Sequence, residues 1–416
     1  MTTWLTTPSH ARWLEHQTTS LLAFARPSPL PAGGFGYLDA NGALVTARGA
    51  ELWISCRMTH CFAMAAMMGH PGYAPLADHG VRSLLDGPFA DKQNGGWYSA
   101  ITADGAPASD TKEAYAHGFV ILAAASAAAA NRPNARELLD KALQTNLAHF
   151  WNEQDGMVAD ACSQDFATTD PYRGVNSNMH TLEAYLAAAD VTQDPAWLHR
   201  GLRISTRVVH ENARSNNWRI PEHYDESWSP LLEYNDDNKA DKFRPYGATP
   251  GHGLEWARLI LHLHAGLQAI DPAQAPDWMV PAARNLYARA IEDGWAPGGT
   301  PGFAYTVGWD GTPVTTQRLH WVAAEAIGAA AALHHATQDP IYATDYQKWW
   351  DYVAEFVIDH EKGSWHHETD PDGRPDITIW PGKPDVYHAV QATLIPRLPL
   401  APAMAPALAA GLLDVR

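Results

Sequence analysis

The sequence of 416 residues has very little cysteine and no long apolar run. Its three cysteines, Cys56, Cys61 and Cys162, have the spacing neither of a disulfide framework nor of a zinc site, so we expect a cytoplasmic protein in a reducing compartment. No stretch of about 18 apolar residues occurs, which argues against a membrane-spanning helix. The first residues also lack the basic-then-apolar order of a secretory signal.

Positive charge is scarce as well. The chain has 29 lysine and arginine residues against 46 aspartate and glutamate residues, a formal net charge of −17. Because a negative field repels phosphate groups, we predict that neither nucleic acids nor membrane surfaces are partners. The sequence also lacks a glycine-rich phosphate loop, a dinucleotide-binding fingerprint and a Gly-x-Ser-x-Gly turn, so no nucleotide cofactor is expected.

Aromatic side chains and histidines are plentiful: 17 tryptophans, 15 tyrosines, 10 phenylalanines and 21 histidines. Aromatic rings pack well in a core, and their flat apolar faces also suit sugar rings. Composition alone favours the packing role. The adjacent pairs His334–His335 and His366–His367 each lack a third ligand at a recognisable spacing, so no metal site is predicted.

Two internal repeats interleave along the chain. The first is a glycine-aromatic turn, which occurs at residues 34–37, 95–98, 155–157, 302–305 and 363–365. Several copies are followed by a second, Asp-Gly turn, and residues between two such turns are predicted to form short β-hairpins. The second repeat is a histidine near the start of an apolar, alanine-rich helical segment. Its six copies are His60, His117, His180, His252, His320 and His388.

The spacing of these histidines, roughly 60 to 70 residues, accommodates two helices and a connection. Amphipathic segments such as 134–143 alternate with segments such as 120–130 that are apolar all round. We therefore predict an all-α protein, an (α/α)6 barrel with short β-hairpins in the inter-helix loops, in which residues 1–416 form a single domain.

In such a barrel the same end of every inner helix opens into one cavity, so polar residues near those ends should converge. The residues predicted to do so are Arg57, Tyr115, Asn176, His180, His252, Glu255, Trp321 and His388. Two carboxylates follow a histidine by three residues, Glu183 after His180 and Glu255 after His252, and such neighbours can fix an imidazole tautomer.

Other positions allow two interpretations. Gln391 follows His388 at the same spacing and is predicted to orient that ring without charging it. Arg57 is predicted either to clamp a sugar oxygen or to pair with Glu51 or another carboxylate. For His60, His117 and His320 a structural role is favoured. The long loop of residues 222–246 is expected to be a lid or a rim.

Three segments at these residues, 170–183, 241–256 and 383–388, resemble the N-acylglucosamine 2-epimerase superfamily, and the resemblance covers essentially the whole chain. It is strongest to the bacterial branch of mannose and sulfoquinovose isomerases. The resemblance implies an (α/α)6 barrel that converts an aldose into its ketose or C2 epimer without metal or nucleotide. Segment 320–325 is similar to the isomerase branch rather than to the 2-epimerases.

The resemblance also implies roles for single residues. His388 matches the catalytic base, His252 the second acid–base group, and Glu255 the carboxylate paired with it. Positions that bind the sugar are matched by Arg57, Tyr115, Asn176, His180 and Trp321, and we add Glu325 and Gln391 to that predicted set.

The function predicted is the interconversion of D-mannose and D-fructose, or of D-lyxose and D-xylulose, through a cis-enediol, with a monosaccharide as the only predicted partner. The related alternatives are a sulfoquinovose isomerase and a sugar 2-epimerase. An α/α-barrel glycoside hydrolase, which would need Glu183 and Glu255 as its two carboxylates, and a non-catalytic helical binding protein are the alternatives of other classes. The sequence leaves the oligomeric state open, a homo-oligomer included.

Overall fold

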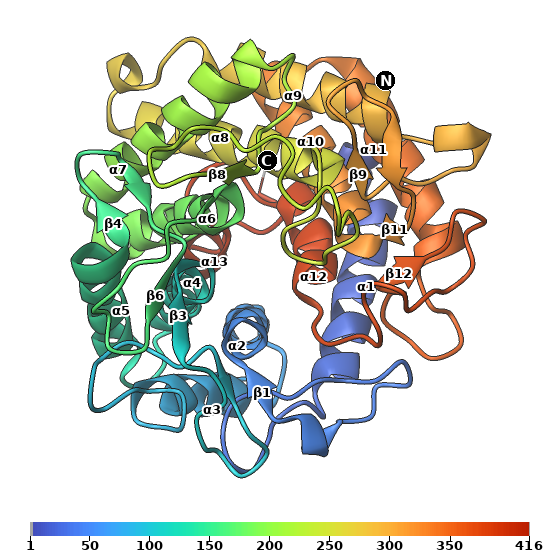
Figure 1. Cartoon of the computed structure of the whole chain (residues 1–416). Coiled ribbons are helices and arrows are strands. Elements are labelled where there is room, and N and C mark those ends of the chain that lie inside the picture. The colour runs from blue at the N-terminus through green and yellow to red at the C-terminus, as the bar shows by residue number, and fades with distance from the viewer. Residues whose placement is uncertain (1–2, 416) are drawn as a thin grey trace.

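The computed structural model describes residues 3–415 and arranges the helices in two concentric rings (Figure 1). The inner ring is α2 (Leu52–Met67), α4 (Ala114–Ala129), α6 (Val175–Thr192), α8 (Pro250–Ile270), α10 (His320–Thr337) and α12 (Tyr387–Leu394). The outer ring is α1 (Pro8–Ala25), α3 (Ala74–Leu85), α5 (Ala135–Thr145), α7 (Ala196–Ser205), α9 (Met279–Gly294) and α11 (Pro340–Tyr352). The predicted (α/α)6 barrel is confirmed.

Side-chain size and polarity assign each helix to its ring. Inner helices such as α4 are rich in alanine and buried nearly all round, which lets neighbouring backbones approach closely. Outer helices are amphipathic, and α5 buries only the stripe formed by Ala135, Leu138, Leu139, Ala142 and Leu143. Burying each leucine of such a stripe contributes roughly 1.5–3 kcal/mol. Helices α5, α7 and α11 each continue into a π-helical turn, Asn146–Phe150, Thr206–Ala213 and Val353–Val357.

The strands form short antiparallel pairs. Two are local hairpins, as predicted: β4 (Trp151–Asn152) with β5 (Met157–Val158), and β9 (Thr306–Val307) with β10 (Pro313–Thr315). The other four join segments about 50 residues apart: β1 (Ala50–Glu51) with β2 (Ala100–Ile101), β3 (Thr111–Glu113) with β6 (Ala161–Ser163), β7 (Arg173–Gly174) with β8 (His223–Tyr224), and β11 (Arg318–Leu319) with β12 (Glu368–Thr369).

These long-range pairs were not predicted, and they position the site. In each of them one strand runs directly into an inner helix, α2, α4, α6 or α10, so the pairing holds the N-terminal ends of these helices at one end of the barrel. Local turn signals cannot reveal a partner strand that lies one repeat away.

The opposite end of the barrel is covered by the C-terminal segment. The ring closes where α1 packs against α12. The chain then crosses the far ends of the inner helices and includes the short helix α13 (Met404–Ala409). Two hydrogen bonds hold this segment: Ala403 N donates to Asp190 at 2.6 Å, and His262 Nδ1 donates to Leu400 O at 2.7 Å. Within residues 3–415, none of the helices is long and apolar enough to cross a bilayer.

Candidate active site

A pocket lies among the N-terminal ends of the inner helices. Seven residues of its lining were predicted from the sequence: Arg57, Tyr115, Asn176, His180, His252, Trp321 and His388. Glu255, predicted as a catalytic carboxylate, also lines it. The remaining lining residues are Trp53, Lys242, Phe243, Tyr305, His320, His367, Trp380, Pro384 and Asp385.

The functional side chains lie in two layers. An upper layer comes from the first turn of its helices: Tyr115, Asn176, His252, His320, Trp321 and His388. A lower layer comes from the sixth residue of four inner helices: Arg57, His180, Glu255 and Glu325. The strand pairs hold the starts of α2, α4, α6 and α10 at one end of the barrel, so Arg57, His180 and Glu325, each the sixth residue of its helix, should lie at a similar depth.

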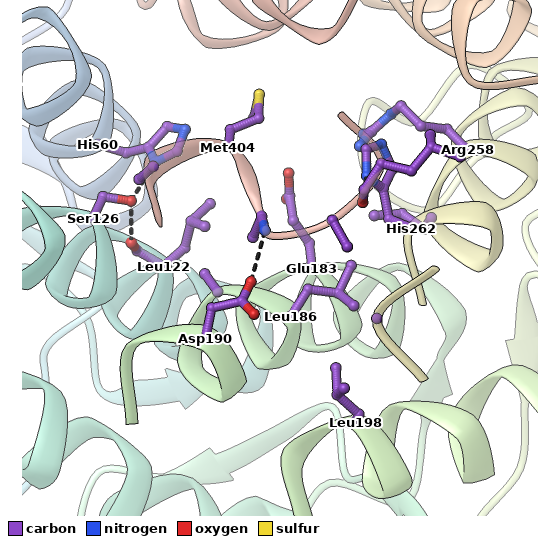
Figure 2. A pocket seen from close by; sticks show the side chains of 17 residues that line it. His60, Leu122, Ser126, Glu183, Leu186, Asp190, Leu198, Arg258, His262 and Met404 are labelled. Carbon is purple, nitrogen blue, oxygen red and sulfur yellow. Dashed lines mark hydrogen bonds between the residues drawn. The ribbon is translucent and has the colours of Figure 1, made fainter. Parts of the chain in front are cut away.

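The structure corrects the expected register of the first histidine. Helix α2 begins at Leu52, so His60 is its ninth residue, whereas the other five histidines lie within the first six residues of their helices. It bonds to Ser126 Oγ at 2.6 Å and lines a separate cavity at the closed end of the barrel, together with Arg258 and His262 (Figure 2). His60 therefore does not reach the pocket.

His117 and His320 lie in different settings, although both were predicted to be structural. His117 is bonded to Glu113 O at 2.8 Å and to Trp97 N at 3.2 Å, outside the pocket. His320 lines the pocket and stacks on His367, with ring centroids 3.8 Å apart. Burial, and then the nearby His388, lower the pKa of His320 to about 3, so its ring is neutral at neutral pH.

His388 is held by a carboxylate that the sequence reasoning had not assigned to it. Its Nδ1 is 3.1 Å from Glu325 Oε1, and the other oxygen of Glu325 accepts from Arg258 Nε at 2.8 Å. Since a carboxylate accepts, Nδ1 carries the hydrogen and Nε2 keeps its lone pair. Burial lowers the pKa of His388. The expectation that Gln391 orients this ring is wrong, because Gln391 donates to the buried carboxylate of Glu183 at 2.9 Å.

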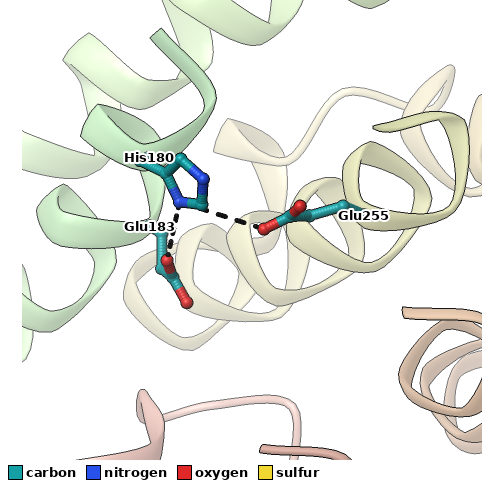
Figure 3. Close-up of side chains that lie close together, drawn as sticks. All are labelled: His180, Glu183 and Glu255. Carbon is teal, nitrogen blue, oxygen red and sulfur yellow. Dashed lines mark hydrogen bonds and ion pairs between the residues drawn. The ribbon is translucent and has the colours of Figure 1, made fainter. Parts of the chain in front are cut away.

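His252 has a carboxylate partner from outside its own helix. Both oxygens of Glu222, which precedes β8, lie 2.9 Å from His252 Nδ1. The predicted pairing of His252 with Glu255 is wrong. His252 is in the first turn of α8, whereas Glu255 is one turn deeper, 3.5 Å from Arg258 Nη2 and 3.9 Å from His180 Nδ1 (Figure 3).

The floor of the pocket is a buried network of charges around Arg258. His180 Nδ1 pairs with Glu183 at 3.3 Å, as predicted from their spacing (Figure 3). Burial lowers the pKa of His180 to about 4. Burial and then the charge of Glu325 raise the pKa of Glu255 well above its usual value. His180, Glu183 and Glu255 are close enough to ligate one cation, but Arg258 already supplies a positive charge to these carboxylates.

Arg57 is the cation nearest to the upper layer. It donates to Tyr115 Oη at 3.1 Å and is 3.6 Å from Asp385 Oδ2. Glu51, one partner considered for it, pairs instead with Arg48 at 3.0 Å. Burial raises the pKa of Tyr115 to about 12, so its hydroxyl remains protonated at neutral pH. These two side chains can donate hydrogen bonds to the oxygens of a ligand.

The loop of residues 222–246 forms part of the rim, as expected. Its Lys242 and Phe243 line the pocket, and the ammonium of Lys242 lies 4.6 Å from the ring centroid of Trp380. Tyr305 Oη donates to Lys242 O at 3.0 Å and holds the loop down. Sequence reasoning missed Trp380 and Glu222 because both lie outside the helices, where no periodic pattern marks an inward-facing side chain.

The chain matches the family model described as N-acylglucosamine 2-epimerase (GlcNAc 2-epimerase) over residues 33–392. The D-mannose isomerase of Thermobifida fusca is 47% identical over 98% of this chain and 99% of its own length. That of Pseudomonas cannabina pv. alisalensis is also 47% identical, over 98% of this chain and 97% of its own length.

A similar fold is known from a crystal structure. A D-mannose isomerase superimposes with a TM-score of 0.85 at 29% identity, covering 93% of this chain and 98% of the other. With the family model spanning most of the chain, these likenesses show that the protein belongs to the N-acylglucosamine 2-epimerase family.

Proposed function

We propose that this protein is an aldose–ketose isomerase that interconverts D-mannose and D-fructose, and also D-lyxose and D-xylulose, without metal or nucleotide. The observation that carries the proposal is a pair of imidazoles at the mouth of the barrel. His252 and His388 each bond to a carboxylate through Nδ1, and their ring centroids lie 5.3 and 5.9 Å from that of Trp321. The curated relatives at 47% identity support the choice of mannose.

Ring opening comes first in the proposed mechanism. The C1–O5 bond of the pyranose breaks, O5 takes a proton from His252 Nε2, and the O1 proton moves to the same nitrogen as the C1 carbonyl forms. Imidazole suits both steps because it gains and loses a proton near neutral pH.

His388 carries out the isomerisation that follows. Its Nε2 lone pair removes the C2 proton, which gives the anion of a cis-enediol, and returns a proton to C1 while the O2 proton moves to O1. Arg57 and Tyr115 can stabilise the negative charge that develops on O1 and O2. A preorganised donor of this kind typically lowers a barrier by about 3 kcal/mol.

One observation favours an anionic sugar such as sulfoquinovose as a second candidate. Lys242 lines the pocket and, among residues 3–415, has no carboxylate within ion-pair distance. Arg244, the neighbouring cation, is already paired with Asp160 at 2.8 Å. Because the curated relatives at 47% identity are D-mannose isomerases, we favour a neutral sugar.

The proposal treats the whole chain as one catalytic domain, because residues from Arg57 to His388 share a single pocket. It also places the reaction in the cytoplasm, a setting that suits three free and buried cysteines.

The test is a sugar panel with the purified, EDTA-treated protein. We expect fructose to form from mannose, and His388→Ala to abolish its formation. Conversion of sulfoquinovose alone would favour the second candidate. Glucose from mannose would indicate 2-epimerase activity, and release of reducing sugar from an oligosaccharide would indicate a hydrolase. No reaction with any sugar would overturn the proposal.

A further inference from the structure

The two mouth histidines have carboxylate partners in unlike surroundings. Glu222 directs both of its oxygens to His252 Nδ1, at 2.9 Å each. Within residues 3–415, no lysine or arginine lies within ion-pair distance of Glu222. Glu325, in contrast, divides its oxygens between His388 Nδ1 at 3.1 Å and Arg258 Nε at 2.8 Å. One imidazole thus has a carboxylate to itself, and the other shares its carboxylate with a guanidinium.

Arg258 is a fixed charge in this arrangement. Its side chain is buried between the pocket and the cavity at the closed end of the barrel (Figure 2). A guanidinium cannot give up its proton in a protein, so Arg258 neither accepts nor relays protons. Its only effect on the reacting groups is electrostatic, and it acts through Glu325 and Glu255.

The physical consequence is a difference in how strongly each ring is stabilised in its charged form. A carboxylate in contact favours the imidazolium, and a nearby cation opposes it. The groups that face His388 from neighbouring elements are Glu325, Arg57, Asp385, His180, His320 and His367. Those that face His252 are Glu222, His223, Glu255 and the ring of Trp321. Burial lowers the pKa of His388, and Arg57 lowers it further, whereas Glu325 and Asp385 raise it. Because Glu325 also pairs with Arg258, its carboxylate opposes this lowering less than an undivided carboxylate would.

We propose that Glu222 and Arg258 are positioning residues that give the two histidines opposite tasks. Glu222, with both oxygens at His252 Nδ1, stabilises positive charge on that ring, so that its Nε2–H can donate to O5 as the sugar ring opens. Arg258 draws the charge of Glu325 away from His388, so that this ring stays neutral and its Nε2 can accept the C2 proton. The inference rests on the proposed isomerase function.

The first test is Glu222→Gln, which keeps the size of the side chain and removes its charge. Exposed Glu226, four residues along the same loop, provides the matched control Glu226→Gln. For Glu222→Gln we expect kcat with mannose to fall at least tenfold with KM within twofold. The alkaline limb of the kcat profile should move to lower pH by about one unit or more, whereas Glu226→Gln should match the unaltered protein. An unchanged profile in an active Glu222→Gln enzyme would overturn the proposal.

The second test needs no turnover and no variant at Glu222 or Arg258. Histidine side-chain ¹⁵N NMR of the sugar-free protein, assigned with His252→Gln and His388→Gln, reports the protonation state and tautomer of each ring. We expect His388 to be neutral with hydrogen on Nδ1 at a pH where His252 still carries two protons. The reverse order would overturn the inference even if mannose is isomerised. The expected order without any isomerisation would instead contradict the proposed function.

Discussion

The two ends of the barrel both contain buried histidines, but they surround them differently. At the mouth, His252 and His388 bond to carboxylates and line an open pocket. At the closed end, His60 bonds to the hydroxyl of Ser126 and His262 to the carbonyl of Leu400, beneath the C-terminal segment. Burial lowers the pKa of both closed-end histidines to about 4.

The difference shows what separates a reactive histidine from a packing one in this fold. A buried ring with neutral partners stays uncharged at neutral pH and only fills space and hydrogen-bonds. A ring that touches a carboxylate and faces the pocket has its charged form stabilised, although burial can still outweigh this effect, as it does for His180. A histidine must therefore lie near the start of an inner helix to reach the pocket, but this position alone does not make it an acid–base group.

The largest effect is expected at the mouth. His388→Ala removes the proposed base, so kcat with mannose should fall by roughly 10²–10⁴, the usual contribution of a general base. Binding of mannose, measured by calorimetry, should change by only a few-fold. Turnover like that of the unaltered protein would contradict the role of this histidine.

A smaller loss is expected from the cation beside the upper layer. Arg57→Met removes a charged donor from the pocket, and kcat should fall by about 10²–10³. The matched control is Arg48→Met, because Arg48 is exposed and pairs with Glu51 outside the pocket. Equal losses in the two variants would argue for a general effect on folding rather than on catalysis.

A substitution at the closed end of the barrel should lower the free energy of unfolding and leave kcat nearly unchanged. His60→Phe removes one buried hydrogen bond, while the Ser126 hydroxyl still donates to Leu122 O, so the variant should lose about 0.5–1.5 kcal/mol of unfolding free energy, with kcat within twofold. Differential scanning calorimetry and a mannose assay measure the two quantities. A large loss of kcat in a variant that is otherwise stable would break the contrast between the two ends.

The same histidine makes stability depend on pH. Burial lowers the pKa of His60 from its usual 6.5 to about 4 in the folded protein, so between these pH values the unfolded chain binds a proton that the folded one does not. Stability should therefore fall as the pH decreases from about 6.5 to about 4. Urea titrations should give a shallower fall for His60→Phe, and equal slopes would contradict the assignment.

The smallest effect concerns the pH profile of turnover. Since burial lowers the pKa of His388 below its usual value of 6.5, more than half of this base is still neutral at pH 6.5. The limiting rate at pH 6.5 should therefore exceed half of its value at pH 7.5. A steeper fall, in a protein that remains folded, would mean that another group is the base.

The two rings of helices could be predicted because each helix shows, within its own sequence, whether it is apolar all round or amphipathic. Segments 120–130 and 134–143 belong to α4 and α5, one in each ring, as expected. The long-range strand pairs could not be predicted, because their strands are only two or three residues long. Because α2 begins directly after β1, the position of His60 relative to the pocket could not be predicted from the sequence either.

The pocket was predicted better than its internal contacts. Residues near helix starts, such as Asn176 and Trp321, converge as expected. Spacing along a helix correctly paired His180 with Glu183 but failed for His252, because an i, i+3 neighbour lies one turn deeper and the ring bonds a carboxylate 30 residues away. Contacts between distant segments decide these partners, and no local pattern encodes them.

The most direct test of the account follows mannose by proton NMR in deuterated buffer, with the EDTA-treated protein and a long incubation. Proton transfer through His388 predicts that fructose appears and that deuterium accumulates at its C1 over repeated forward and reverse turnovers, because an imidazole proton exchanges with solvent. An unchanged mannose spectrum, or fructose that remains free of deuterium at C1 at equilibrium, would contradict the account.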